Sequence, residues 1–431
     1  MNGIFLAIVF IAFVVGAFTG GMEAVSVSAF DGAKKSVELA ISLIGYMALF
    51  LGLMKVAEEG GLLRLLAKAI RPIMVRLFPD VPPEHPAMGA MIMNIAANMM
   101  GLTNAATPLG IKAMKELNSL NRTPGVATNA MVLFLAINTS GLALLPSGVV
   151  SVRAAEGSSD PWGIVASTLA ATGFATIIGI GAAKLFSRLF AMPAATVEEG
   201  QAVEEDDGVE VGEITNDSWG VWALRAFLVV VLFVLAGPPL LAVGWEAQAD
   251  TLRSISGTIG DWVIPTLILS LLAYGAANGV KVYESFIKGA KEGFDTGVLI
   301  IPYLVAILVA VGMFRGSGAM EHLTGWMGIV TEPIGLPAEV LPQALVRPLS
   351  GSGAYGLMIE LVQTHGPDSY IGYLSTTLQG STDTTFYVLA VYFGAVGVSK
   401  TRHAVLAGLS ADFAGFIAAV VVCALLFGHL A

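Results

Sequence analysis

Residues 91–110 read MIMNIAANMMGLTNAATPLG and combine hydrophobic residues with polar and helix-breaking ones. This stretch lies inside an uncharged run, residues 87–111, that is long enough to reach across a bilayer. Three asparagines, two threonines, two glycines and a proline nevertheless interrupt it. Such a segment survives at membrane depth only when it is buried in protein or lines a water-filled cavity. We therefore expect a re-entrant hairpin with a polar tip, where Gly101, Pro108 and Gly110 can break the helix.

The composition around this stretch is that of a membrane protein. The chain has 431 residues, of which 55% are hydrophobic and 13% are charged, and its mean hydropathy is +0.78. Soluble proteins carry about 25% charged residues. The apolar runs are too long for the strands of a membrane β-barrel, so they predict an all-α polytopic protein of the inner (cytoplasmic) membrane. The spacing of histidine, cysteine and carboxylate residues indicates no metal site, and no cofactor is expected beyond a coupling Na⁺ or H⁺.

The chain begins with an apolar segment and is divided near its middle by an acidic one. Residues 1–20 lack a basic start and have a longer apolar run than a secretory signal, so we interpret them as a retained first span. Residues 190–218 are acidic and without apolar periodicity, which is typical of a flexible linker. The linker separates a first half, residues 1–189, from a second half, residues 219–431.

The two halves repeat each other. Gly32-Ala33-Lys34 and Gly289-Ala290-Lys291 open similar segments, and further matching residues share the same offset of 257. Each half then continues with an amphipathic stretch, a segment of small residues, a long span with a polar centre and a final span. Internal repeats of this kind indicate a transporter. The basic amphipathic stretch, residues 62–78, is interpreted as an interfacial helix on anionic lipid and not as a nucleic-acid site.

The positive charges predict how the repeats are oriented. Five full spans separate the two Gly-Ala-Lys motifs if residues 88–110 re-enter, namely 36–56, 126–150, 162–186, 222–243 and 261–280. An odd number makes the repeats inverted. This count also places sixteen of the 22 Lys and Arg residues on one side, which is then the cytoplasmic side. We predict about nine full spans, a cytoplasmic N-terminus and an external C-terminus.

Two further spans carry polar residues at their centres. Asn138 and Thr139 precede a glycine and a proline in the span 126–150, and Asp383 lies among hydroxyl residues in the span 370–395. Discontinuous helices at matching places of two repeats indicate a transport site. The candidate substrate- or ion-binding residues are Asn94, Asn98, Asn104, Thr107, Asn138, Thr139, Arg347, Ser350, Ser352, Gln379, Ser381 and Asp383.

Several of these residues have a structural alternative. Asp383 either binds an ion or solute or pairs with Arg347, and Arg347 either holds an anionic substrate or reaches to the external surface. The hydroxyl residues are more often used to pack helices closely than to bind a solute. Asp412, in the last span, is interpreted as a contact between helices.

The motifs also carry a family resemblance. In the first half MNIAANMMGLTNAATPLG, NRTPG and AINTSGLALLP resemble spore maturation protein A. In the second half KVYESFIKGAKEGFDTGVLIIPYLVAILVAVGMFRGSGAM, VRPLSGSGAYG and TTLQGSTDTTFYVLAVYFGAVG resemble spore maturation protein B. Nearly the whole chain is covered, so it resembles a fusion of two proteins usually encoded separately. Both belong to the nucleoside recognition, or Gate-domain, group, which is similar to concentrative nucleoside transporters and to the membrane part of ferrous iron transporters. The resemblance implies inverted repeats with re-entrant hairpins.

The sequence favours one function over two alternatives. The favoured function is secondary active transport of a small polar or anionic solute, such as a nucleoside or related metabolite. The first alternative is a non-transporting membrane scaffold that recruits partners, for example in spore maturation. An intramembrane enzyme is disfavoured because Ser350 and Ser352 have no evident base, and we expect no catalytic residue. The expected partners are the solute, the lipid bilayer and further copies of the chain in a homo-oligomer, but no nucleic acid.

Overall fold

The computed structural model describes residues 2–190, 265–320, 322, 325–326 and 336–430. This described part is all-helical and holds no β-sheet. Four of its helices are long and apolar enough to cross a membrane: α2 (Met22–Glu59), α8 (Ile164–Leu189), α11 (Val282–Gly316) and α17 (Ala404–Phe427). The chain is therefore a membrane protein, as its composition predicts. The acidic linker from residue 191 on and the expected span 222–243 lie outside the described residues, as does most of the second amphipathic stretch, 319–336.

The described elements follow the same order in both halves. The first half has α2, the amphipathic α3 (Leu62–Leu77), a hairpin of α4 (Pro86–Met99) and α5 (Thr103–Ser119), a broken span of α6 (Asn129–Ser140) and α7 (Ser147–Ala155), and α8. The second half has α11, a short hairpin of α13 (Leu341–Val346) and α14 (Gly351–His365), a broken span of α15 (Tyr370–Ser381) and α16 (Thr385–Gly394), and α17. Ahead of both, α1 (Asn2–Thr19) folds back against α2 and α11.

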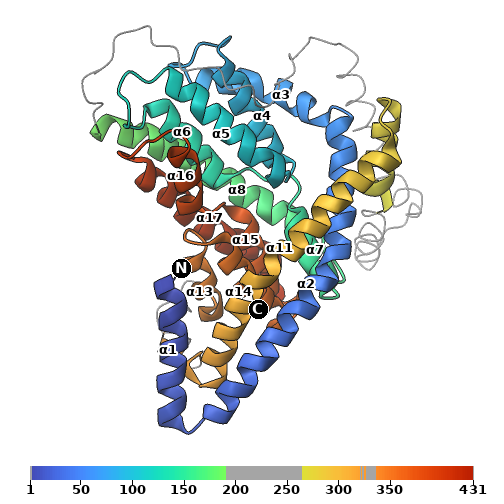
Figure 1. The fold of residues 1–431 in the computed structure, drawn as a ribbon, viewed down its shortest axis with the longest axis vertical. Helices are drawn as coiled ribbons and strands as arrows, with labels where there is room; N and C mark the ends of the chain where they lie inside the picture. Colours follow the sequence, from blue (N-terminus) through green and yellow to red (C-terminus); the bar gives the residue numbers. More distant parts are fainter. Residues whose placement is uncertain (1, 191–264, 321, 323–324, 327–335, 431) are drawn as a thin grey trace.

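The two long helices α2 and α11 pack against each other in opposite directions (Figure 1). A side chain on Gly32 would collide with the backbone of Leu308, and one on Gly289 would collide with the backbone of Leu51. Both contacts need glycine because the helix axes approach closely there. The two motif glycines are thus contact points inside long helices and do not open segments, which corrects the prediction. Leu51 and Leu308 are themselves separated by the offset of 257, so the two contacts are made by equivalent pairs of residues.

The two hairpins lie in different parts of the molecule, with α4 and α5 in the upper part and α13 and α14 in the lower part of Figure 1. Gly101, with a positive φ of 72°, makes the turn of the first hairpin. Of the three residues predicted to break the helix, Gly101 alone lies at the turn, because Pro108 and Gly110 lie within α5. Gly110 is explained by close approach instead, since a side chain there would collide with the hydroxyl group of Tyr392.

The first parts of the two broken spans form the centre of the protein. In α6 every residue from Ala130 to Ser140 is buried, and α15 is buried along nearly its whole length. A helix that is buried on all sides belongs to the interior of a larger protein. The polar residues on α6 and α15 therefore face other helices and not lipid.

Candidate functional site

Each broken span ends its first helix at an equivalent place. Helices α6 and α15 both have twelve residues, and both end at a serine, Ser140 and Ser381. Each begins at a hydroxyl side chain that accepts a backbone N–H: Thr128 from Met131 and Ser369 from Gly372. Such N-caps fix where a helix starts.

The two breaks have different local causes. Segment 141–146 contains Gly141 at its start and Pro146 at its end, which interrupt helical hydrogen bonding. Segment 382–384 has neither residue type. There the Asp383 Oδ1 accepts the N–H of Thr384 at 2.7 Å, and Thr382 adopts an extended backbone with φ −146° and ψ 167°. Short polar side chains that bond nearby backbone compete with the helix in this way.

The breaks of the two halves meet each other. The backbone N–H of Asp383 donates to the carbonyl of Thr139 at 2.6 Å. Each break leaves backbone groups without partners in its own helix, and this contact satisfies one group from each half. The polar centre of the first span thus lies against the polar centre of the second.

A cluster of amide groups, which we call the amide cluster, lies beside this contact. The side-chain amide of Asn98 donates to Oδ1 of Asn138 at 2.9 Å, and the hydroxyl of Tyr392 approaches the same oxygen at 3.3 Å. Asn94 donates to the Tyr392 hydroxyl at 3.2 Å and to the carbonyl of Ala106 at 2.8 Å. Asn94 is fully buried and its Oδ1 has no hydrogen-bond partner among the described residues. The cluster joins α4 and α6 of the first half to α16 of the second.

Arg347 lies at the second break. Its guanidinium donates to the carbonyl of Thr382 and to the hydroxyl of Thr384, the latter at 2.9 Å. The residue is 8% exposed, which excludes the alternative that it reaches to the external surface. Its interaction with Asp383 is electrostatic only, because the described structure shows no ion pair between the two side chains within 4.0 Å. Of the two alternatives for Asp383, the direct pair with Arg347 is therefore not formed, and Arg347 bonds the backbone and hydroxyl of the neighbouring residues instead.

Each hairpin tip packs on the break of its own half. At the first tip, the carbonyl of Met99 accepts the N–H of Leu144, and Gly101 lies against the carbonyl of Leu145. At the second tip, the carbonyl of Pro348 accepts the N–H of Phe386. A hairpin movement would therefore move the adjoining break as well.

The remaining predicted residues lie outside the amide cluster, and several of them bond only nearby backbone groups. Ser350 caps α14 by accepting the N–H of Gly353 at 3.0 Å, with Ser352 beside it. The hydroxyls of Thr139 and Ser381 bond the backbone of their own helices. Gln379 is buried with an unpartnered Oε1, and Thr107 is half-buried on α5. The side chain of Asn104 lies outside the described part.

Sequence reasoning missed one polar residue of this centre, Tyr392, and assigned a second, Asp412, only as a contact between helices. Tyr392 gave no signal, because a tyrosine in an apolar span is unremarkable by composition. Asp412 gave the signal of an ionisable residue in the last span, and it does contact a neighbouring helix through the hydroxyl of Thr385 at 2.7 Å. It also lines a cavity together with Arg347. Among the described residues, no group of three or more His, Cys, Asp or Glu side chains is placed to hold a metal ion.

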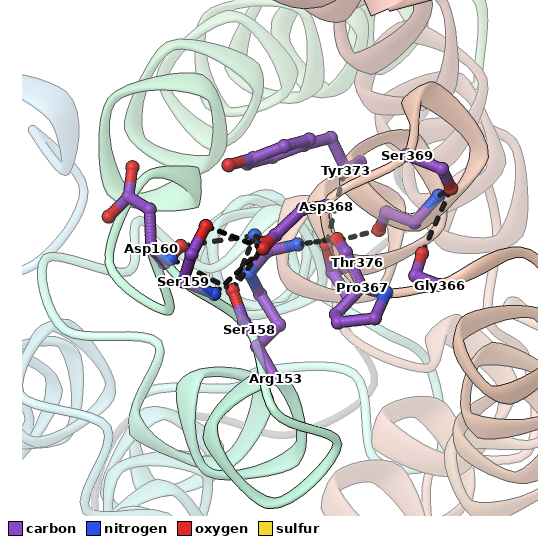
Figure 2. Close-up of polar contacts among 11 residues, drawn as sticks. Arg153, Ser158, Ser159, Asp160, Gly366, Pro367, Asp368, Ser369, Tyr373 and Thr376 are labelled. Atoms are coloured by element: carbon purple, nitrogen blue, oxygen red, sulfur yellow. Dashed lines mark hydrogen bonds and ion pairs between the residues drawn. The ribbon is translucent and has the colours of Figure 1, made fainter.

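Arginines tie the outer ends of the broken spans together. Arg153, at the end of α7, is fully buried and donates to the carbonyl of Pro367 just before α15 (Figure 2). It also bonds Oδ1 of Asp368 at 2.9 Å and lies 4.1 Å from the ring centre of Tyr373. At the opposite ends, Arg402 follows α16 and donates to the carbonyl of Ala127 just before α6 at 2.9 Å. The end of each broken span is thus fixed to the start of the other.

The charge of Asp368 is stabilised within this tie. Burial by itself raises the pKa of the carboxyl group. Hydrogen bonds from Ser158 and Ser159, together with the charge of Arg153, outweigh this effect and hold the pKa of Asp368 below its ordinary value. Figure 2 shows both serines pointing at the carboxylate. The tie is therefore an ionised, hydrogen-bonded contact at neutral pH.

Known proteins match both halves of this arrangement. The Gate family, described as nucleoside recognition, matches residues 40–156 and 298–399. Spore maturation protein B of Bacillus subtilis (strain 168) is 49% identical over 166 residues, which cover 38% of this chain and 93% of that protein. Spore maturation protein A of the same organism is 42% identical over 182 residues, covering 42% of this chain and 91% of that protein. These matches are consistent with a fusion of the two. The chain belongs to the Gate, or nucleoside recognition, family.

Proposed function

We propose that the protein is a secondary active transporter of a small polar or anionic solute, such as a nucleoside, built from two inverted repeats in the cytoplasmic membrane. The observation that carries the proposal is the meeting of two broken spans, one from each half, through Asp383 and Thr139. Interrupted helices at matching places in two repeats are typical of solute sites near the centre of a bilayer. A scaffold has no need of such polar breaks.

The inverted arrangement is supported by two independent features. The long helices α2 and α11 run in opposite directions and exchange equivalent contacts at Gly32 and Gly289. The arginine ties also lie at opposite ends of the broken spans. The expected topology places Lys34 outside and Ser119 in the cytoplasm. In intact cells, a membrane-impermeant maleimide should label Lys34→Cys, and should label Ser119→Cys only after permeabilisation. Labelling of both residues from one side would refute the inversion.

The amide cluster is the proposed solute site. Amide groups can both donate and accept hydrogen bonds, which suits solutes with several hydroxyl and ring nitrogen groups. Within the cluster, Asn94 keeps a buried amide oxygen without a partner in the described structure. A buried acceptor without a hydrogen bond costs about 1–3 kcal/mol of free energy, and a solute that donates a hydrogen bond to it would recover that energy. The two hairpin tips beside the breaks provide elements that could move during alternating access.

A ligand screen with a matched pair of variants tests this site. The purified protein is heated with nucleosides, nucleobases, dicarboxylates or Na⁺, and a ligand that binds the folded state raises the apparent melting temperature. Asn138→Ala should abolish the shift from a binding solute and its uptake into proteoliposomes. Asn278→Ala is the control. The side-chain amide of Asn138 also donates to the carbonyl of Phe134, four residues earlier, at 2.9 Å, and that of Asn278, outside the cluster, donates in the same way to the carbonyl of Tyr274 at 2.8 Å.

Two outcomes would contradict the proposal. If Asn138→Ala and Asn278→Ala kept the same ligand shift and the same uptake, the amide cluster would not be the site. If the screen gave no shift and the proteoliposomes took up no member of the panel, the scaffold role would become the better explanation. That role would also agree with the names of the two spore maturation relatives.

A further inference from the structure

A cavity of about 510 Å³ lies between α13, α15 and α17, and none of the residues that line it belongs to the amide cluster. Its lining is mostly apolar and includes Leu345 and Phe413, which are 66% and 65% exposed. Two charged residues, Arg347 and Asp412, also line it, and both are more than nine-tenths buried. A cavity of this composition does not suit a polar solute, but it gives a buried carboxyl group an apolar surrounding.

Asp412 is incompletely satisfied in this cavity. Its Oδ2 accepts the hydroxyl of Thr385 at 2.7 Å, whereas its Oδ1 has no hydrogen-bond partner among the described residues. A buried ionised carboxylate needs paired charge or several hydrogen bonds, and without them it takes up a proton. The unpartnered Oδ1 is the position for that proton.

The two charged groups around Asp412 act in opposite directions, because Arg347 favours the ionised carboxylate and Asp383 favours the neutral carboxyl. Arg347 and Asp383 are the charged residues of the described structure that share its electrostatic surroundings from α13 and from the second break. The other residues that line the cavity are uncharged: most are apolar, and Ser381 and Thr382, at the end of α15, carry hydroxyl groups. Arg347 bonds Thr382 and Thr384, and the described structure shows no ion pair between Arg347 and Asp412 within 4.0 Å.

We propose that Asp412 is a proton-binding site whose protonation state decides whether Arg347 holds the second break. With Asp412 protonated, Arg347 stays on the carbonyl of Thr382 and the hydroxyl of Thr384. With Asp412 ionised, the carboxylate attracts the guanidinium away, and the break between α15 and α16 loses its tie. A proton fits this site better than Na⁺, because a proton needs one carboxylate oxygen, whereas Na⁺ needs several oxygen ligands and the site offers few. The inference rests on the proposed transport function and names its coupling ion.

Reaction with dicyclohexylcarbodiimide tests proton binding without any substrate. The reagent takes the proton of a carboxylic acid, bonds the carboxylate oxygen at its central carbon, and rearranges to an N-acylurea that retains the whole mass of the reagent. We expect intact-mass and peptide analysis of the full chain to find the modification at Asp412. The modified fraction should fall as pH rises from 5 to 9. Asp412→Asn should lose it, and Asp383→Asn should keep it.

The same samples test the link to Arg347. At pH 8.5, backbone hydrogen exchange of the peptide covering residues 382–386 should be slower in Asp412→Asn, which mimics the protonated state, than in the wild type. Wild-type peptide mapping and its pH profile remain decisive if Asp412→Asn does not fold. No modification at Asp412 at any pH, or protection by Na⁺ but not by equal choline, would overturn proton binding. Equal exchange in the two proteins would overturn the control of the break. Because neither assay involves transport, failure here is distinguishable from failure of the proposed transport function.

Discussion

Replacing Arg153 by methionine should destabilise the protein strongly. The guanidinium is fully buried and bonds the carbonyls of Pro367 and Asp160, the hydroxyl of Ser158 and the carboxylate of Asp368. Methionine keeps much of the apolar volume but provides no donor. Hydrogen bonds to charged groups contribute roughly 1.5–3 kcal/mol each, and removing one partner of a buried ion pair costs about 3–5 kcal/mol. Asp368 keeps the bonds from its serines, so we expect a loss of about 3–5 kcal/mol and not the full sum.

The free energy of unfolding can be measured by titrating the purified protein with SDS in mixed micelles and following tryptophan fluorescence. Arg71→Met is the matched control, because Arg71 also pairs with a carboxylate, Glu84, but its side chain is 40% exposed and that of Glu84 is 89% exposed. Exposed ion pairs contribute about 0–1 kcal/mol. If Arg153→Met cost no more than Arg71→Met, the tie between the broken spans would not be an important source of stability, and the reasoning from burial would be wrong.

Two further perturbations test other parts of the structure. Gly110→Ala should destabilise the protein by about 1–3 kcal/mol in the same SDS titration, because the added methyl group collides with the hydroxyl of Tyr392. Gly181→Ala is the control and should be neutral or slightly stabilising, because a methyl group there meets nothing within 4 Å. Equal effects of the two variants would show that α5 and α16 are not in close contact. His403 is buried, and its burial and the neighbouring charge of Arg402 lower its pKa from 6.5 to about 4. The folded state therefore keeps this histidine neutral, so its contribution to stability is present above pH 6.5 and is lost as pH falls toward 4. The apparent melting temperature should fall less over this range in His403→Asn than in the wild type, and identical pH profiles would contradict the assignment.

Several parts of the site could be predicted from local sequence alone. The polar residues around Asn138 and Asp383 stand out against long apolar runs, and the structure does break both spans there. Asn94, Asn98 and Asn138 were expected to share one site, and their amide groups do lie in one hydrogen-bonded cluster with Tyr392. The reason is physical: an amide in a membrane span is costly unless it finds partners, and the nearest partners are other amides.

Other parts could not be predicted, because the relevant partners are far apart in the chain. Gly110 looked like a helix breaker, but its role depends on Tyr392 of the other half. Arg347 had two possible orientations, and only the position of the second break showed that it bonds Thr382 and Thr384. Asp412 looked like an ordinary contact between helices until the cavity beside it was visible.

An all-helical membrane protein with two similar halves could be predicted from the residues alone, because hydropathy, charge and the repeat of motifs are properties of neighbouring residues and of fixed offsets. The two breaks could also be located in this way, since glycine, proline and short polar side chains interrupt a helix wherever they occur. The tertiary structure alone decided which groups face each other across the halves, such as Asp383 with Thr139 and Arg153 with Pro367. These contacts depend on how buried helices pack, and packing is set by the shapes of surfaces that no local pattern of residues records.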